Sequence, residues 1–375
     1  MKIGVLIQDL YGRGAESAAA AIARGLCSRG IEVDLIVSSL QRHNELKFGK
    51  TGFPLPDTAN WIHLPFARAR YNIFALRKYL RETSAIAIFV MSPSYAPILS
   101  VAAIGLRRRP LIGYVIHGVV GITDSHEILT PPKRFSAKWL VDKFIYSRLD
   151  RVLCVSKAGG QDFLRMNPFY KAEKVFTVYN PVVDEYLISK IHCPPVHEWL
   201  AKKICPTFVA AGQFDEAKGH LYIMEAIRRV NLKKPVRLII FGEGPLKDEY
   251  QRFIHENALS DVISLPGYTK NLPAEIKASD GFLHASFRES FGIVLVEALA
   301  AGVPVIATEA PFGPPEILDS GRYGKLVPIK DAIAMSKAIE EVLDGKAVSC
   351  EDDSWSRFTV EKITSLYLRS IGIDK

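Results

Sequence analysis

Short apolar runs alternate with longer segments of helical periodicity along almost the whole chain. In the first half, the runs are KIGVLIQ, VDLIV, WIHLPF, IAIFVM, LIGYVIH, RVLCVS and VFTVY. The segments between them predict helices at residues 15–29, 71–82, 135–149 and 157–166. Strands that are apolar throughout and are joined by helices are typical of a parallel sheet buried on both faces.

The alternation stops near residue 188 and restarts near residue 207. The intervening ISKIHCPPVHEWLAKKICP has paired prolines and no clear strand, which favours a linker. Strands then continue as TFVAAG, VRLIIFG, VISLPG, GFLHAS and PVIAT, with helices expected at 221–230, 246–257, 273–279 and 291–301. We therefore expect an α/β chain of two doubly wound, Rossmann-like domains facing a central cleft, where ligands bind.

The end of the chain predicts one more helix. WSRFTVEKITSLYLRSI is amphipathic, and its large apolar residues can share one face: Phe358, Ile363, Tyr367 and Leu368. The pattern thus divides the chain into an N-terminal domain at residues 1–182, a C-terminal domain at 183–355 and a terminal helix at 356–375.

Composition adds a positive charge to this picture. The 375 residues are 48% hydrophobic and 23% charged, which is ordinary for a soluble globular protein. A net charge of +8 suggests an anionic partner: nucleotide phosphates, nucleic acid or an acidic membrane surface. The five cysteines are scattered and the first apolar run is short, so we expect a reduced, cytoplasmic protein without a secretion signal or a membrane span.

A glycine turn follows the first strand. Gly12 and Gly14 match the first two glycines of the dinucleotide-binding pattern G-x-G-x-x-G, but Ser17 replaces the third. The second strand also lacks an acidic residue at its end, which a nicotinamide cofactor would need. Besides a nicotinamide site, the glycine turn has two other interpretations. It is a tight turn without a ligand, or a loop whose N–H groups bind a sugar or phosphate.

A second candidate site lies in RESFGIVLVEALAAGVPVIATEA. Ser290, Phe291 and Gly292 open a predicted helix, whose N-terminal N–H groups and dipole can bind a diphosphate without a metal. Glu289 precedes that helix and can accept hydrogen bonds from sugar hydroxyls, whereas Glu297 lies two turns later and can bind a ribose. One such glutamate alone would be read as a solvated helix charge, but the arrangement of the two favours a site.

These motifs resemble those of the retaining glycosyltransferases of the GT-B fold, family 4, which use nucleotide-sugar donors. Glu289 and Glu297 resemble the E-x7-E signature of that family. Other matches follow in order along nearly the whole chain: YGRGAE, VIHG, VLCVSKA, VYNPV, AAGQFDEAKGH, IIFGEGP and LPGYTKNLPAEIKASD. The resemblance implies an acceptor-binding N-terminal domain, a donor-binding C-terminal domain and a last helix that crosses back to the first domain.

The resemblance also implies roles for single residues. Glu289 would bind hydroxyls of the donor sugar under its reacting face, and Lys218 would neutralise the diphosphate. His117 would lie near the donor sugar and the acceptor, although a lone histidine after a strand can equally be structural. Further donor contacts would come from Glu297 on the ribose and from Gly12, Gly14, Gln213, Tyr268, Ser290, Phe291 and Gly292.

One position departs from the family. Gln213 stands where the family has an arginine that pairs with Lys218 on the diphosphate, so one cation is missing. Donor binding could be weaker, or another cation such as Arg13 or Lys270 could compensate. The missing cation keeps open an inactive relative or a non-catalytic subunit that binds the nucleotide sugar. A nucleotide-sugar epimerase of the same fold is a further alternative.

The implied reaction moves a hexose or N-acetylhexosamine, with retention, from a nucleotide sugar, taken as a UDP-sugar, to a saccharide or lipid-linked saccharide. Cell-surface polysaccharide, lipopolysaccharide and glycolipid synthesis use such reactions. The sequence has no Asp-x-Asp motif, so we expect no metal and no other cofactor.

Two segments combine cations with aromatic residues, at 68–81 and 133–148, and a third basic cluster is formed by residues 107–109. Such segments fit an anionic membrane surface, so we expect peripheral contact with the inner face of the cytoplasmic membrane if the acceptor is lipid-linked. The alternative is that the aromatic residues pack inward and the cations form a solvated face. The sequence carries no nucleic-acid-binding motif, so nucleic acid is not an expected partner.

Overall fold

The computed structural model describes residues 1–10, 14–38, 54–118, 120–121, 129–348 and 353–374. The chain forms two compact units: Met1–Pro181 with Val360–Lys375, and Val182–Thr359. The first division lies one residue from the position expected from the sequence. The second division differs, because residues 356–359 belong to the second unit and not to the terminal helix.

The sheet of the first unit has seven strands in the order β3-β2-β1-β4-β5-β6-β7, and all neighbours pair in parallel. The order reverses between β1 and β4, and such a reversal opens a crevice at the carboxyl ends of the two strands. The strands follow the apolar runs closely: β1 (Lys2–Ile7), β2 (Glu32–Val37), β3 (Asn60–His63), β4 (Ala87–Val90), β5 (Leu111–Ile116), β6 (Arg151–Cys154) and β7 (Val175–Thr177).

Helices cover this sheet, as the burial of its strands requires. Leu6 of β1 belongs to a core cluster shared with residues of three helices, and alternate residues of the strand face the other side. The helices of the unit are α1 (Gly14–Ser28), α3 (Ile73–Glu82), α4 (Tyr95–Ala102), α5 (Ala137–Tyr146), α6 (Lys157–Met166) and α15 (Val360–Ser370).

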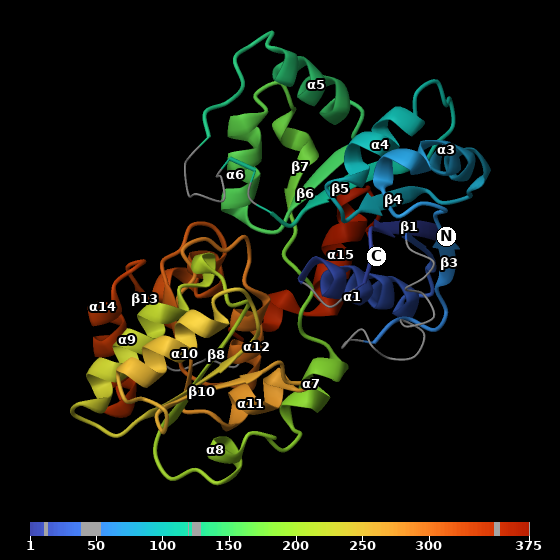
Figure 1. Ribbon diagram of the computed structural model, residues 1–375. Coiled ribbons are helices and arrows are strands. Elements are labelled where there is room, and N and C mark those ends of the chain that lie inside the picture. Colours follow the sequence, from blue (N-terminus) through green and yellow to red (C-terminus); the bar gives the residue numbers. More distant parts are fainter. Residues whose placement is uncertain (11–13, 39–53, 119, 122–128, 349–352, 375) are drawn as a thin grey trace. The chain divides into compact units, whose positions relative to one another are not determined.

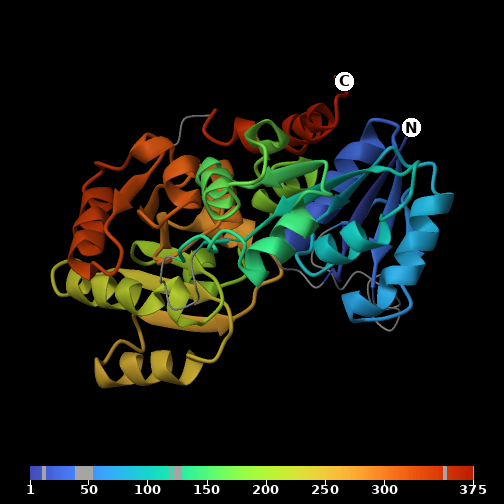
Figure 2. The ribbon, with the colours of Figure 1, turned by 90° about the horizontal axis from the view of Figure 1, so that it is seen from above.

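The last helix packs on the first unit. Ile363, Tyr367 and Leu368 are fully buried, and the Tyr367 ring meets Phe89 of β4 edge to face with 4.8 Å between centroids. Figure 1 and Figure 2 both show α15 beside α1. The two helices approach so closely at Gly25 that a Cβ atom there would lie 2.1 Å from Thr364 Oγ1, so this contact requires glycine.

Phe358 corrects the prediction for the terminal helix. This residue lies in the 3₁₀ turn Ser356–Phe358, before the helix begins. Its ring packs against Phe291 of the second unit, with 5.6 Å between centroids. The prediction that Phe358 shares a helix face with Tyr367 is therefore wrong.

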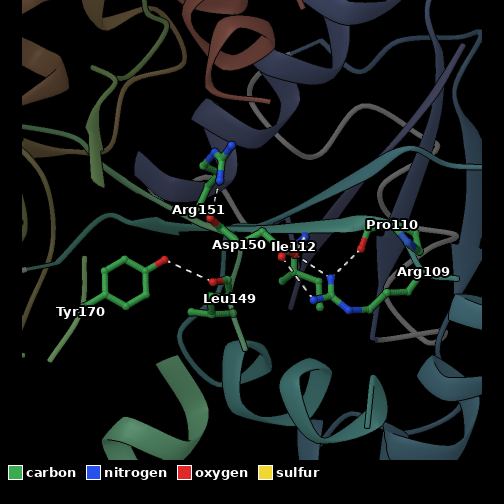
Figure 3. Close-up of polar contacts among 7 residues, drawn as sticks. All are labelled: Arg109, Pro110, Ile112, Leu149, Asp150, Arg151 and Tyr170. Atoms are coloured by element: carbon green, nitrogen blue, oxygen red, sulfur yellow. Dashed lines mark hydrogen bonds and ion pairs between the residues drawn. The ribbon is translucent and has the colours of Figure 1, made fainter. Parts of the chain in front are cut away.

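An ion pair fixes the amino ends of β5 and β6. Arg109 donates to both carboxylate oxygens of Asp150, at 2.6 and 3.2 Å, and Asp150 Oδ2 also accepts from the backbone N–H of Ile112 at 2.8 Å (Figure 3). Arg109 is thus a structural cation, whereas Arg107 and Arg108 beside it are exposed.

The second unit repeats this plan with six parallel strands in the order β10-β9-β8-β11-β12-β13, which reverses between β8 and β11. The strands are β8 (Thr207–Ala211), β9 (Arg237–Phe241), β10 (Ile263–Gly267), β11 (Gly281–His284), β12 (Val305–Thr308) and β13 (Lys325–Val327). The helices are α7 (Glu185–Ile191), α8 (Glu198–Ala201), α9 (His220–Asn231), α10 (Lys247–Glu256), α11 (Leu272–Ala278), α12 (Ile293–Ala301), α13 (Gly313–Ile317) and α14 (Ala332–Leu343).

The linker predicted at residues 188–206 is wrong. The end of α7 and all of α8 lie in this segment, within the second unit. The buried carboxylate of Glu275 in α11 accepts from the backbone N–H groups of Val196 at 3.0 Å and His197 at 3.3 Å. These bonds fix the segment to the second unit.

Candidate active site

Two side chains of opposite charge meet where the strand order of the second unit reverses. Lys218 follows β8 and Glu289 follows β11, and these strands are neighbours in the sheet. Lys218 Nζ donates to Glu289 Oε2 at 2.6 Å, and the side chains are only 28% and 15% exposed. Open α/β sheets bind ligands at such reversals. The structure thus brings together two residues to which the sequence assigned catalytic roles.

The turn that carries Lys218 is fixed by local hydrogen bonds. Asp215 Oδ1 accepts from the backbone N–H of Lys218 at 3.1 Å and caps the 3₁₀ turn Glu216–Lys218. The N–H of Phe287 donates to the carbonyl of Ala217 at 2.8 Å. The loops after β8 and β11 are therefore joined through their backbones as well as through the ion pair.

Backbone geometry also fixes Glu289. Its carbonyl accepts from the N–H of Gly313 at 2.9 Å. Gly292 has a φ of 105°, and a Cβ atom there would lie 3.0 Å from Leu295 Cδ1 and 3.3 Å from Glu289 Cγ. Glycine therefore avoids strain and leaves room for the Glu289 side chain. Because α12 begins at Ile293, the turn 290–292 precedes the helix and does not form its first turn.

A third residue completes the cluster, and the sequence analysis missed it. His284 ends β11 and is almost fully buried. Its Nε2 lies 3.5 Å from Glu289 Oε2 and 3.1 Å from Ser286 Oγ. Burial lowers the pKa of His284, so the ring is neutral at pH 7. The only sequence signal was a histidine at the end of an otherwise apolar strand.

The cluster keeps Glu289 ionised. Burial by itself would raise the pKa of this carboxyl, but the hydrogen bond with His284 and the charge of Lys218 outweigh burial and lower the pKa to about 2. An ionised carboxylate only accepts hydrogen bonds. Glu289 can therefore receive sugar hydroxyl hydrogens and can stabilise positive charge that develops beside it.

Glu297 differs from Glu289 in its electrostatics. It lies on the second turn of α12, where burial raises the pKa of its carboxyl to about 7. The two glutamates of the E-x7-E pattern are therefore not equivalent. One is a fixed anion, and the other titrates near neutral pH.

The other predicted donor contacts of this unit also follow strands. Gln213 comes after β8, and Tyr268 comes after β10 with 77% of its surface exposed. The buried side chain of Phe291 packs on Phe358, and Ser290 and Gly292 lie on either side of it in the turn before α12.

Three predicted site residues belong to the first unit. His117 directly follows β5, and burial lowers the pKa of its imidazole to about 4, so the ring is neutral at pH 7. Gly14 begins α1. Gly12 lies outside the described residues.

The basic segment 133–148 contains both inward and outward residues. Trp139 is buried and packs on Phe169, as the solvated-face alternative expects. Four other large apolar side chains are 43% to 67% exposed: Phe135, Leu140, Val141 and Phe144. Arg148 lies 3.7 Å from the centre of the Phe144 ring. Neither alternative from the sequence describes the whole segment.

Two features are absent from the part of the chain that the structure describes. Its His, Cys, Asp and Glu residues include no group of three or more that could hold a metal ion. Its helices include none that is both long and apolar enough to cross a bilayer.

The two Rossmann-like units, the second with an ion pair at the carboxyl edge of its sheet, have the architecture of the GT-B fold. Alr3699/HepE of Anabaena, solved in complex with UDP and glucose, has this fold, with a TM-score of 0.74 over 99% of each chain at 19% identity. Residues 12–186 match the profile of Glycosyltransferase Family 4, and residues 198–354 match that of Glycosyl transferases group 1. The chain belongs to this family of enzymes.

Two curated relatives are similar in sequence. The N-acetylgalactosamine-N,N'-diacetylbacillosaminyl-diphospho-undecaprenol 4-alpha-N-acetylgalactosaminyltransferase of Campylobacter jejuni is 26% identical over 353 residues, covering 92% of this chain and 90% of the relative. The lipopolysaccharide core biosynthesis glycosyltransferase LpsE of Rhizobium meliloti is 27% identical over 173 residues, covering 44% and 50%.

Proposed function

We propose that this enzyme transfers a hexose or N-acetylhexosamine, with retention of configuration, from a UDP-sugar to a saccharide or lipid-linked saccharide acceptor. The ion pair of Lys218 and Glu289 carries the proposal, because it sets a cation and a fixed anion side by side at the sheet edge. The names of the relatives support an acceptor in polysaccharide, lipopolysaccharide or glycolipid synthesis, and the UDP complex of HepE supports the nucleotide.

The two charges fit the two ends of the breaking bond. The leaving diphosphate gains negative charge, which Lys218 and the N–H groups at the start of α12 stabilise. The anomeric carbon gains positive charge, which the carboxylate of Glu289 stabilises while it accepts hydrogen bonds from sugar hydroxyls. In this proposal Lys218 contacts Glu289 and the diphosphate together. Glu297 binds the ribose.

Retention follows if the acceptor attacks from the face that the diphosphate leaves. The acceptor oxygen forms the new bond to the anomeric carbon as the bond from that carbon to the phosphate oxygen breaks. The acceptor proton passes to an oxygen of the leaving diphosphate. No protein group becomes covalently attached, and no metal or other cofactor takes part.

The first unit is assigned to the acceptor. A neutral His117 can donate or accept one hydrogen bond at each ring nitrogen, which suits a site near hydroxyl groups. Gly12 and Gly14 are assigned to a glycine loop that contacts the diphosphate and the sugar. These roles come from the resemblance to the family, and substitution of the three residues tests them.

The test is a thermal-shift panel of UDP-, GDP- and ADP-sugars, followed by transfer to candidate saccharide acceptors. The expected result is stabilisation by a UDP-sugar, transfer that persists in EDTA, and an α-linked product from an α-linked donor. Turnover of the donor without any acceptor would favour an epimerase. No stabilisation by any nucleotide sugar would contradict the proposal.

We also propose that the enzyme works in the cytoplasm, at the inner face of the cytoplasmic membrane. The exposed apolar residues in and before α5 lie among cations, since Arg134 stands over Phe135 at 5.0 Å and Arg148 stands over Phe144 at 3.7 Å. Apolar side chains with flanking cations fit an anionic lipid surface.

Vesicle flotation tests this contact. The wild-type protein should float with vesicles that contain phosphatidylglycerol and should not float with phosphatidylcholine alone. A triple variant, Leu140→Ser with Val141→Ser and Phe144→Ser, should stay in solution. Ile333→Ser, which removes an equally exposed apolar residue from α14, should float like the wild type. Equal flotation of the triple variant would exclude α5 as the contact.

A further inference from the structure

The first unit has a groove of about 470 Å³ at the carboxyl edge of its sheet. Gln8, directly after β1, and Ser94, after β4, both line it, so it lies where the strand order reverses. This is the position that Lys218 and Glu289 occupy in the second unit. The lining residues are Gln8, Ala67, Arg68, Ala69, Arg70, Ser94 and Ile98.

The charges of this groove are all of one sign. Arg68 and Arg70 line it, and no aspartate or glutamate does so among the described residues. Arg68 has no ion pair or hydrogen bond from its side chain within that part of the chain, and Arg70 donates to Tyr71 Oη at 2.9 Å while it lies over the Tyr71 ring. Neither guanidinium is neutralised by a described carboxylate.

The uncharged polar groups of the groove also favour an anion. Ser94 Oγ donates to Gln8 Oε1 at 3.0 Å, so the oxygen of this amide is already occupied. Its NH₂ group has no partner among the described residues and is available as a donor. Ser94 is the N-cap of α4 and Ile98 lies in its first turn, so the positive end of that helix dipole also borders the groove.

The backbone that carries the arginines is held rigidly. Asn72 is fully buried, and its side chain bonds both backbone groups of Phe66, at 3.1 Å to the N–H and 2.6 Å to the carbonyl. The same side chain donates to Tyr95 Oη at 2.9 Å. The N–H of Tyr71 donates to the carbonyl of Arg68 at 3.1 Å. The loop is therefore fixed before a ligand arrives.

We propose that this groove binds a phosphate or diphosphate carried by the acceptor. Two guanidinium groups and an amide offer donors to more than two oxygens, whereas a carboxylate is satisfied by one bidentate arginine. Beside the arginines, Phe66, Tyr71 and Phe74 are half or more exposed, which suits the apolar part of a lipid-linked acceptor. The inference rests on the proposed function, which assigns the acceptor to this unit.

Hydrogen exchange with four probes locates the binding. Farnesyl diphosphate and inorganic pyrophosphate should protect residues 64–74, whereas farnesol and glucuronate should not. Protection by both diphosphates shows that the phosphates are recognised, and stronger protection by farnesyl diphosphate assigns the site to a lipid-linked acceptor. Protection by glucuronate alone, or diphosphate protection confined to residues 212–220, would overturn the proposal.

A pair of charge-matched variants tests the arginines. Arg68→Gln with Arg70→Gln should weaken the affinity for farnesyl diphosphate by about tenfold or more, because two charge-assisted contacts are lost. Lys78→Gln with Arg81→Gln removes the same charge from exposed positions of α3 that do not line the groove, and should leave affinity unchanged. Equal weakening in both variants, or in neither, would overturn the proposal.

Donor binding separates this inference from the proposed function. The groove variant should bind nucleotide sugar like the wild type and should raise the KM for a phosphate-bearing acceptor without changing that for the donor. If no nucleotide sugar binds but farnesyl diphosphate still protects 64–74, the groove stands and the proposed function fails. If transfer proceeds to a neutral saccharide and no diphosphate protects that loop, the proposed function stands and the groove fails.

Discussion

The two units of this glycosyltransferase place opposite kinds of chemistry at equivalent points of their sheets. In the second unit, Lys218 and Glu289 face each other at 2.6 Å where the strand order reverses. In the first unit, the same point of the sheet has Arg68 and Arg70, with no lining carboxylate among the described residues. At the edge of the second sheet the two charges neutralise each other. At the edge of the first sheet the two arginines have no carboxylate partner among the described residues.

The difference fits the separate functions proposed for the two sheets. Charge that must stabilise a developing transition state is most effective when it is fixed in advance, and the bonds around Lys218, His284 and Glu289 fix it. A site that recognises an anionic ligand instead keeps its cations available until that ligand binds. The first two predictions below each remove one charge of the ion pair, the next two change residues beside it, and the last concerns Glu297.

The largest effect is expected from Glu289→Gln. The amide has the same shape but no charge, so kcat should fall by about 10³-fold while the folded structure persists. Transfer assays and circular dichroism measure the two effects. Glu225→Gln is the control, because Glu225 pairs with Arg228 and Arg229 on the surface of α9. A Glu289 variant with more than a tenth of wild-type transfer would refute the assignment.

Lys218→Ala should follow, with a loss of about 10²-fold in kcat/KM. The diphosphate loses its cation, and Glu289 loses one of the two partners that lower its pKa. Isothermal titration should show weaker binding of UDP, and Lys218→Arg should restore part of it. If the Lys218→Ala variant bound UDP as tightly as the wild type, a contact between Lys218 and the diphosphate would be refuted.

His284→Ala should lower kcat at pH 7 by about tenfold or less, because His284 positions Glu289 without contacting substrate. The pKa of Glu289 is lowered in the folded state, so its stabilising contribution is present above about pH 4.5 and is lost as the pH falls towards 2. Without His284 this pKa rises, and the acid limb of the kcat–pH profile should move to higher pH. His284→Gln should move the acid limb back towards its wild-type position. An unshifted profile in His284→Ala would mean that His284 only packs in the core and does not position Glu289.

Gln213→Arg should act in the opposite direction. An arginine here supplies the cation that the family pattern contains, and should tighten UDP binding by about three- to tenfold. Gln251→Arg adds the same charge at an exposed position of α10 and serves as the control. Equal tightening in both variants would point to the general positive field and not to a contact with the diphosphate.

The smallest effect is expected from Glu297→Gln. The pKa of Glu297 is raised to about 7, so its stabilising contribution is present below about pH 4.5 and is lost as the pH rises through 7. Between pH 5 and 8, the wild type should lose about 2–3 kcal/mol of unfolding free energy that the variant does not lose. Urea unfolding at both pH values measures the difference, and parallel changes in the two proteins would contradict the raised pKa.

Local patterns predicted every strand of the first sheet and five of the six strands of the second, but missed β13 and the helix α14 that follows it. Most strands are buried on both faces, so their sequences are largely apolar, and the helix at 157–166 has the expected bounds. By contrast, α4 was missed because YAPILSVA is apolar nearly all round and contains a proline, which leaves no amphipathic stripe.

Contacts between distant residues explain three further errors, which concern the linker, His284 and the groove. Val196 and His197 are fixed by Glu275, nearly eighty residues later, and nothing near the paired prolines indicates that bond. The sequence motif predicted Glu289, but His284 reaches it only because β11 ends where the next loop turns back. The groove lining comes from the loops after three strands, β1, β3 and β4, whose order in the sheet no local pattern reveals.

The return of α15 to the first unit makes that unit discontinuous in the chain. Tyr367, which packs on Phe89, follows the whole second unit in the chain, so the first sheet is translated long before the helix that covers it. The whole second unit is synthesised in between, and both of its ends are joined to segments of the first unit. The order of synthesis therefore allows the second unit to fold first, while the first unit stays incomplete until α15 has been translated.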